Sequence, residues 1–268
     1  MSAKPIFRAF LAPVVLLSVA LPCAAEADKT NSRWETALAE TKPIFNARLR
    51  YESVEQEGLP EDASALTYRF RAGVETGKIF DTALLVEFDH IDDLIDDFNS
   101  TINGKTGYPV VADPNATELN RFQLTNTSLP DTTITLGRQR IGLDDARFVG
   151  NVGWRQNEQT FDGARIQNST LGELKVDFTY IAQINRIFGD DSAMGRWDGD
   201  SYLLNLSHPT PIGTLTGFVY QIDVDNAGGV FSSQTVGARL AGKQAIGTGK
   251  LGYTVSYATQ SDYGSSSL

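Results

Sequence analysis

The sequence predicts an all-β protein, a transmembrane antiparallel up-and-down β-barrel, from two observations. The first is alternation: along residues 65–75, which read ALTYRFRAGVE, apolar and aromatic side chains alternate with polar ones. A strand sends successive side chains to opposite faces, so one face is apolar while the other carries Arg69 and Arg71. No soluble core would bury two such charges unpaired. Strands of about ten residues with one apolar and one polar face are typical of outer-membrane barrels.

The second observation is the length of the connections between the predicted strands, which alternates strictly between long and short. The long connections begin near Glu55, Ile91, Gly142, Asn185 and Val224, and the short ones lie near Gly77, Pro130, Thr170, Pro211 and Ile246. Outer-membrane barrels have long external loops and short periplasmic turns. A soluble sandwich has no reason to sort its loops by parity, so the pattern favours the membrane barrel.

Residues 1–27 read as a secretory signal peptide. Lys4 and Arg8 give a positive start, an apolar run covers 10–21, and an A-x-A cleavage sequence stands at 25–27. The only cysteine, Cys23, would be removed with this segment. The alternative, a transmembrane anchor, needs about 20 apolar residues, and this run is too short. We therefore expect cleavage near Ala27 and a mature chain without cysteine.

Residues 28–43 are polar and are expected to lead from the periplasm into the first strand. One or two helical turns could form around Trp34 and Leu38 before Pro43, where a helix would end. We assign this lead-in no function.

Eleven strands are expected in the remaining part of the chain, residues 44–268. They are expected at 44–54, 65–75, 80–89, 119–129, 132–141, 159–168, 173–184, 200–208, 214–223, 233–243 and 250–260. In the first strand, Phe45, Leu49 and Tyr51 share one face, while Arg48 and Arg50 share the other. This division repeats the pattern of residues 65–75.

The later strands show the same period of two. Val176 and Phe178 share a face in the seventh strand, and Tyr253, Val255 and Tyr257 share a face in the eleventh. Eleven is an odd number, whereas single-chain bacterial barrels have an even number and leave no edge open to lipid. We therefore expect this chain to be the N-terminal portion of a larger barrel whose C-terminal strands are missing. The alternative is a small barrel in which one strand has been miscounted.

The overall charge excludes one large class of partners. The formal net charge is −10, which argues against a nucleic-acid-binding protein. The predicted mature chain also has no apolar run long enough for a membrane helix. If the chain crosses a membrane, we therefore expect strands, and not helices, to contact the lipid.

Three stretches resemble the alginate-export family of outer-membrane β-barrels. They are NARLRYE at 46–52 followed by ALTYRFR at 65–71, then FDTALLVEF at 80–88, and finally LGRQRI at 136–141 followed by RFVG at 147–150 and TFDGAR at 160–165. The resemblance implies a monomeric barrel with an arginine-bearing pore, through which an anionic polysaccharide or another anionic solute would move. Periplasmic export partners would be possible and are not identified by the sequence.

Arginines on the predicted inner faces are the candidate substrate path. They are Arg48, Arg50, Arg69, Arg71, Arg121, Arg138, Arg140 and Arg165. Guanidinium groups bind carboxylates through two parallel hydrogen bonds, and a row of them could pass an anion from site to site. The alternative is that they pair with Glu52, Glu75, Glu87 and Asp89 and only brace the wall. Arg138 shares a face with Leu136, so its direction is less certain than that of the others.

The segment 142–158 is a candidate constriction. It is long and mixes basic with aromatic residues, including Trp154 and Arg155. We expect it to fold into the pore, as a hypothesis that conductance measurements can test.

Acidic residues lead into the connection that follows the third predicted strand. They are Asp89, Asp92, Asp93, Asp96 and Asp97. A Ca²⁺ site is a weak candidate here, because oxygen ligands suit Ca²⁺ but the spacing matches no known Ca²⁺ loop. A solvated acidic loop is the simpler interpretation, so no metal and no other cofactor is predicted.

An enzyme is not expected. The chain has only two histidines, His90 and His208, and loop parity puts them at opposite ends of the barrel, so no shared catalytic site forms. The sequence therefore predicts a passive channel in the outer membrane of a Gram-negative cell. The alternatives are a general diffusion porin for small nutrients and a structural or adhesive barrel that conducts nothing.

Overall fold

The computed structural model describes residues 24–227, 230–264 and 266 of this chain. A helix, α1 (Ala24–Ala39), precedes eleven strands, and one short 3-10 helix, η1 (Asp225–Ala227), lies between the ninth and tenth strands. The strands are β1 (Lys42–Val54), β2 (Ala63–Glu75), β3 (Thr82–Asp97), β4 (Ala116–Asn126), β5 (Thr132–Gln139), β6 (Thr160–Leu171), β7 (Leu174–Asn185), β8 (Arg196–Thr210), β9 (Gly213–Ile222), β10 (Ser233–Ile246) and β11 (Gly249–Ser261).

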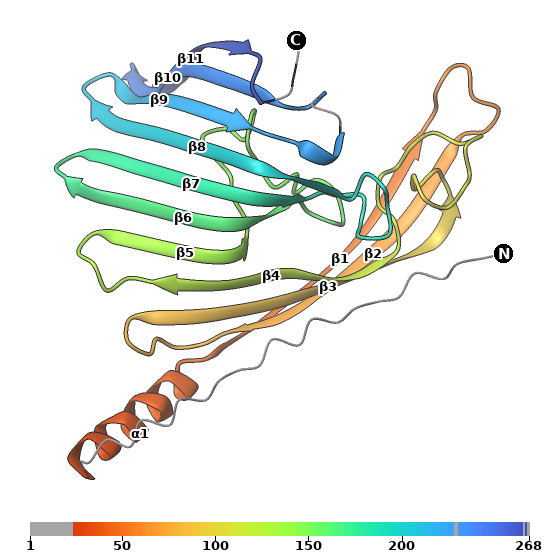
Figure 1. Cartoon of the computed structure of the whole chain (residues 1–268). Coiled ribbons are helices and arrows are strands. Elements are labelled where there is room, and N and C mark those ends of the chain that lie inside the picture. Colours follow the sequence, from red (N-terminus) through yellow and green to blue (C-terminus); the bar gives the residue numbers. More distant parts are fainter. Residues whose placement is uncertain (1–23, 228–229, 265, 267–268) are drawn as a thin grey trace.

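All eleven strands form one antiparallel sheet in sequence order, from β1 at one edge to β11 at the other. The sheet curls strongly, so that it has a concave and a convex side (Figure 1). The predicted number of strands, their antiparallel up-and-down order and the all-β class are confirmed. Most strand ends differ from the sequence-based expectation by only a few residues.

The two faces of the sheet are the reverse of those in a soluble protein. In β2, Arg69 and Arg71 are each 7% exposed, whereas Phe70 between them is 47% exposed. Large apolar residues are exposed on the convex face, including Phe45, Leu49, Tyr51, Phe88, Phe122, Leu124, Leu136, Ile166, Phe178, Leu215, Val255 and Tyr257. Polar residues are buried on the concave face, including Thr67, Glu87, Asp89, Asn120, Thr135, Thr179, Ser201, Asn205, Thr216 and Thr235. The predicted division of the faces is thus confirmed.

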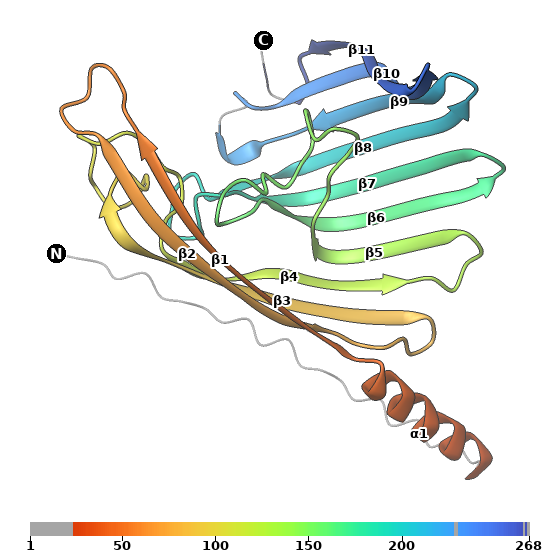
Figure 2. The same cartoon turned by 180° about the vertical axis from the view of Figure 1, so that it is seen from behind.

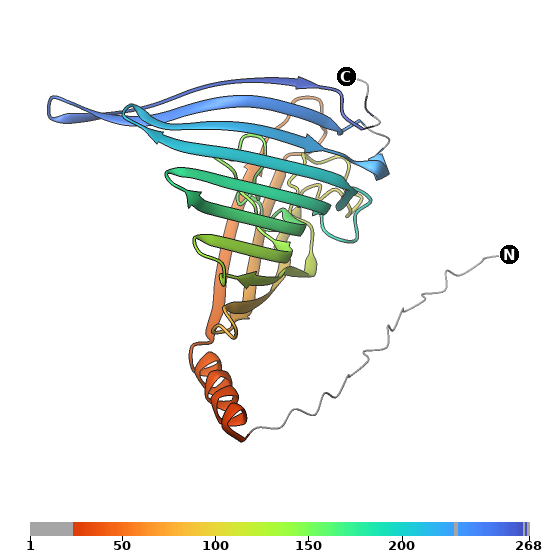
Figure 3. The same cartoon turned by 60° about the vertical axis from the view of Figure 1, so that its left-hand side comes forward.

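The connections alternate in length, as predicted. The long ones cover residues 55–62, 98–115, 140–159, 186–195 and 223–232, and the short ones cover 76–81, 127–131, 172–173, 211–212 and 247–248. The short turns lie together at one end of the sheet, and α1 lies beyond that same end (Figures 1 and 3). Long loops and short turns therefore lie at opposite ends of the sheet (Figure 1).

The third strand is longer than predicted. β3 continues to Asp97, so the acidic residues beyond Asp89 lie in a strand and not in a loop. They pair with β2 as far as Ser64, across a bulge between Leu66 and Thr67. A run of like charges has low strand propensity, and here the pairing with β2 overrides that propensity. Asp96 and Asp97 are exposed at the end of β3 that lies opposite the β2–β3 turn, whereas Asp92 and Asp93 are partly buried and Asp89 is buried.

The helix is also longer than the one or two turns that were expected. α1 ends at Ala39, where the Gly77 amide donates a hydrogen bond of 3.0 Å to the Ala37 carbonyl. It begins at Ala24, upstream of the predicted cleavage position, and most of the predicted signal peptide (residues 1–23, with Cys23) lies outside the described residues. Cleavage near Ala27 stays a prediction. Among the described residues, no helix is both long and apolar enough to span a membrane.

Candidate functional site

The segment 140–159, between β5 and β6, crosses the concave side of the sheet (Figure 2). We call it the crossing segment. It touches the wall at two places that differ in chemistry. Its first part packs on β6–β9, and its last part binds β1–β4 together with the connection 98–115.

The first contact is an apolar anchor. Ile141, Leu143 and Val149 of the crossing segment pack against buried side chains of the wall. The wall residues of this cluster are Phe161, Ile181, Ile184, Leu203, Phe218 and Tyr220. The Leu143 amide donates to the Val149 carbonyl at 3.0 Å, which closes this part of the segment into a small loop. Burying these side chains against one another removes apolar surface from water and holds the segment to the wall.

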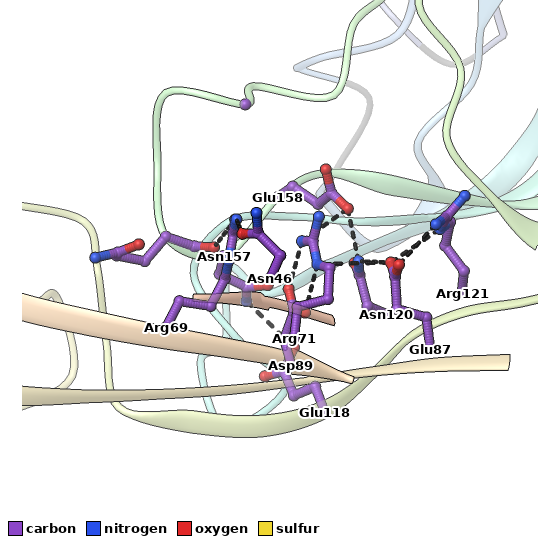
Figure 4. Close-up of polar contacts among 12 residues, drawn as sticks. Asn46, Arg69, Arg71, Glu87, Asp89, Glu118, Asn120, Arg121, Asn157 and Glu158 are labelled. Carbon is purple, nitrogen blue, oxygen red and sulfur yellow. Dashed lines mark hydrogen bonds and ion pairs between the residues drawn. The ribbon is translucent and has the colours of Figure 1, made fainter. Parts of the chain in front are cut away.

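The second contact is a polar anchor centred on Glu158, which is 5% exposed (Figure 4). Its Oε1 accepts a hydrogen bond of 2.6 Å from Asn120 Nδ2 and lies 2.9 Å from Arg71 Nη2. Arg140 Nε also donates to this oxygen, and Asn151 Nδ2 donates to Oε2 at 3.0 Å. Four donors thus satisfy one buried carboxylate, as a buried charge requires.

Glu87 of β3 is the second centre of the polar anchor and is fully buried. Arg121 binds both of its carboxylate oxygens, at 2.9 and 2.6 Å, and Arg140 Nη2 lies 2.9 Å from Oε1. Asn120 Nδ2 also donates to Oε1 at 2.7 Å. Both Asn120 and Arg121 reach Glu87 because the β3–β4 register skips Asn120, a bulge that turns two consecutive side chains to the same side.

Gln156 fixes the crossing segment to the first two strands. Arg48 Nε donates to Gln156 Oε1 at 2.8 Å, and Arg69 Nη1 donates to the Gln156 carbonyl at 3.1 Å. The Gln156 amide group donates in turn to Thr67 Oγ1 at 2.9 Å, and its backbone N–H donates to Asp113 Oδ1 at 2.7 Å. Gln156 is therefore bound by β1, by β2 and by the connection 98–115, and it has no exposed surface.

The two residues predicted for the constriction both contact β1. Arg50 lies over the Trp154 ring, 4.3 Å from its centroid, and donates to the Trp154 carbonyl at 2.7 Å. Arg155 Nη1 lies 3.5 Å from Glu52 Oε2. The segment thus lies against the concave face of the sheet, while the constriction of a pore and any effect on conduction stay predictions.

The structure brings most of the eight predicted arginines to the crossing segment. Arg71, Arg121 and Arg140 pair with Glu87, Asp89 or Glu158, and Arg50 pairs with Glu52 and Asp113. Arg48 and Arg69 bind amide and carbonyl oxygens instead. Two arginines lie outside this group.

These two, Arg138 and Arg165, bind acids of neighbouring strands. Arg138 Nε lies 2.8 Å from Asp162 Oδ1, and Arg165 Nη2 lies 2.5 Å from Asp177 Oδ2. Six of the eight arginines therefore form ion pairs in the structure, which is the arrangement that the bracing alternative describes. Glu75, named in that alternative, forms no ion pair within the described ranges. Whether the arginines also meet a solute stays a prediction.

Part of the crossing segment has an unusual backbone. Asp144, Ala146 and Val152 have φ values of 56°, 58° and 50°, in the left-handed region that residues other than glycine rarely adopt. Such residues are kept only where the surrounding contacts determine the chain path. The two anchors supply those contacts.

The acidic residues of β3 do not converge. Asp89 binds Arg71 through two bonds of 2.6 Å, Asp92 accepts from Tyr68, and Asp96 pairs with Lys105 at 2.8 Å. In the described part of the chain, no group of three or more acidic, histidine or cysteine side chains is arranged to hold a metal ion. The weak Ca²⁺ interpretation therefore gains no support.

The two histidines lie on different strands. His90 of β3 contacts Thr117 Oγ1 at 2.8 Å, and His208 lies within β8, which continues past the expected end at residue 208 to Thr210. The turn itself covers residues 211–212.

Sequence reasoning missed several residues of the polar anchor. Asp113, Asn120, Gln156 and Asn157 carry no periodic signal, and their partners are distant in sequence. The one available signal was the polar run 156–159 directly before a strand, because consecutive polar side chains near a wall need partners.

No protein-family model matches this sequence, and a search of curated proteins gave no match. Solved structures do match. OccAB1 from Acinetobacter baumannii has a TM-score of 0.62 and 17% identity, covering 84% of this chain and 53% of that one. OccAB3 from the same organism has a TM-score of 0.61 and 13% identity, covering 85% and 59%.

The outer membrane protein OpdK from Pseudomonas aeruginosa, in a structure with vanillate, has a TM-score of 0.62 and 15% identity, covering 85% of this chain and 59% of that one. This chain thus spans between 53% and 59% of the length of these three proteins. The likeness shows the fold, an antiparallel sheet of the kind that forms porin barrels. It does not support the resemblance to the alginate-export family.

Proposed function

We propose that this chain forms the wall and the constriction of an outer-membrane channel for small anionic solutes. The observation that carries the proposal is the reversed sheet, with buried arginines and carboxylates on the concave face and exposed aromatic and aliphatic side chains on the convex face. Such a sheet is stable only where its convex side meets lipid and its concave side meets water or polar groups.

The crossing segment supports a narrow passage. It lies on the concave side and is held at both ends, so it would reduce the width available to a solute. Small solutes, the general porin alternative, fit this arrangement better than a polysaccharide does. Passage would be passive, without a cofactor or a catalytic step, and the orientation would put the long loops outside the cell.

Supporting observations come from the structural neighbours. One of them, OpdK, is an outer membrane protein whose structure was determined with vanillate, an aromatic carboxylate. Arginine forks bind carboxylates well, and the polar anchor holds several arginines near the proposed passage. In this proposal a solute carboxylate exchanges with the protein carboxylates as it passes.

The test is reconstitution of the full-length protein in a planar lipid bilayer. Discrete conductance steps and a reversal potential that favours anions are expected in a KCl gradient. Replacing Arg69 and Arg71 by alanine should reduce that anion preference, and unaltered selectivity would leave them as braces. A folded protein that inserts and conducts nothing would overturn the proposal in favour of a structural or adhesive barrel.

Polyuronate addition separates the two solute classes. A current block by polyuronate that neutral glucans do not produce would favour the anionic polysaccharide interpretation. Block by small carboxylates alone would favour the small-solute channel.

A further inference from the structure

Arg186, in the long connection 186–195, lies against two aromatic rings. Its guanidinium carbon lies 3.9 Å from the centroid of the Trp197 ring and 4.7 Å from that of Phe188. Trp197 in turn stacks on Phe231 of the next long connection, with ring centroids 4.8 Å apart. The connection 186–195, the start of β8 and the connection 223–232 thus contribute one cation and three rings to a single stack. Such contacts fix the plane of the guanidinium group.

No carboxylate in the part of the chain that the structure describes neutralises the charge of Arg186. The one hydrogen bond that its side chain makes with a described residue runs from Nη1 to the Met194 carbonyl, at 3.1 Å, and no described carboxylate lies within ion-pair distance. Burial lowers the pKa of Arg186, although a guanidinium group stays charged in proteins. Arg186 is only partly buried, and none of its nitrogen atoms is among the fully buried atoms without a partner. Arg71 and Arg140, in contrast, each bind two or more carboxylates.

The stack lies on the concave side, beside the crossing segment. Trp197 packs against the apolar anchor. The backbone N–H of Asp190, in the same connection as Arg186, donates to Glu118 Oε1 of β4 at 2.7 Å, and Glu118 also accepts from Asn157 of the crossing segment. The connection 186–195 therefore extends from β7 over the concave face to β4, at the long-loop end of the sheet.

We propose that Arg186 and its aromatic neighbours form a docking site for a carboxylate attached to a flat apolar group. The N–H edge of the guanidinium would bind the carboxylate through two parallel hydrogen bonds. The apolar body would rest on exposed rims of the stack, where Phe231 is 49% and Met194 46% exposed. This inference rests on the proposed function, since it places a first binding site at the outer entrance of the channel.

The experiment uses benzoate as the probe and acetate as the compact control anion. Benzoate binding to the full-length protein in detergent is measured by isothermal titration calorimetry, and benzoate block of the current is measured in bilayers. Arg186→Gln should weaken benzoate binding at least about tenfold, because the charged hydrogen bonds between the guanidinium group and the carboxylate are lost. Acetate should bind weakly to both proteins. Arg186→Lys should recover only part of the loss, because an ammonium group cannot form the planar fork.

The matched control is Arg196→Gln, which removes a neighbouring arginine that already pairs with Asp198 at 3.1 Å. It should leave benzoate binding within about twofold of the parent protein, because surface ion pairs contribute little. An unchanged affinity in Arg186→Gln, or an equal loss in Arg196→Gln, would overturn the docking site. Absence of any conductance, with benzoate binding intact, would overturn the channel and leave the site standing.

Discussion

The two anchors of the crossing segment hold neighbouring parts of one chain by opposite means. Ile141, Leu143 and Val149 are held by packing against apolar side chains, whereas Gln156 and Glu158 are held by hydrogen bonds and ion pairs. When a buried apolar side chain is shortened, the loss of stability grows with the volume of the cavity that is left. A buried ion pair is nearly neutral as a whole but strongly destabilising when one partner is removed. The polar anchor should therefore be the more sensitive to a single substitution.

The comparison can be measured by hydrogen exchange of two peptides, 142–150 and 151–159. The Leu143 amide reports the apolar anchor, and the amides of Gln156 and Gln159 report the polar one, since each is hydrogen-bonded in the structure. When closing is fast, the exchange rate follows the free energy of local opening, at about tenfold per 1.4 kcal/mol.

The largest effect is expected for Glu158→Gln. Arg71 and Arg140 would lose a buried carboxylate, which should destabilise the polar anchor by about 3 kcal/mol and speed exchange in peptide 151–159 by roughly a hundredfold. Single-channel conductance should rise as the segment loosens. Glu173→Gln, at an exposed short turn, is the matched control and should change neither quantity. Equal acceleration of peptide 142–150 would mean that the two anchors open as one unit.

A smaller effect is expected for Leu143→Ala. The cavity left in the apolar anchor should destabilise it by about 2 kcal/mol, with faster exchange in peptide 142–150 and little change in 151–159. Leu171→Ala, at an exposed position at the end of β6, makes the same chemical change outside the cluster. If Leu143→Ala altered exchange no more than that control, the apolar contacts would not hold the segment.

Trp154→Leu should have a third, weaker effect. It removes the contact between the indole ring and Arg50, which contributes about 1 kcal/mol, so exchange of peptide 151–159 should rise about fivefold. Trp34→Leu on α1 is the control. No change with Trp154→Leu would show that the Arg50 bond to the backbone carbonyl suffices.

The smallest effect is expected from salt. Raising NaCl from 0.15 to 1 M should speed exchange in peptide 151–159 by no more than about threefold, because buried charges are screened much less than exposed ones. Peptide 142–150 should exchange no faster. A large salt effect on peptide 142–150 would contradict its assignment as an apolar contact.

Much of the wall could be predicted, because side-chain alternation has the same period as the strand and because long and short connections alternate from one strand to the next. Residues 65–75 were sufficient to assign Arg69 and Arg71 to the inner face. The pairing of Arg71 with Asp89 was also anticipated, as the bracing alternative. These contacts are local to one sheet and follow from its register.

The site was less predictable, because its contacts do not follow from periodicity. Gln156 and Thr67 lie 89 positions apart, and the bulge at Asn120 breaks the two-residue period that the prediction used. The extension of β3 through an acidic run was missed for a related reason, since pairing with β2 overrode the local preference. The aromatic surroundings of Arg186 depend on two loops meeting, which no local pattern encodes.

The left-handed residues Asp144, Ala146 and Val152 bear on the order of assembly. Left alone, these residues favour other conformations, so the crossing segment gains its path only from partners on β1–β4 and on β6–β9. We expect the crossing segment to reach its final conformation last, after β9 has joined the sheet, because its partners on β6–β9 must form first. Pulse labelling during refolding should find peptide 142–158 protected after the strands, and earlier protection would refute this sequence of events.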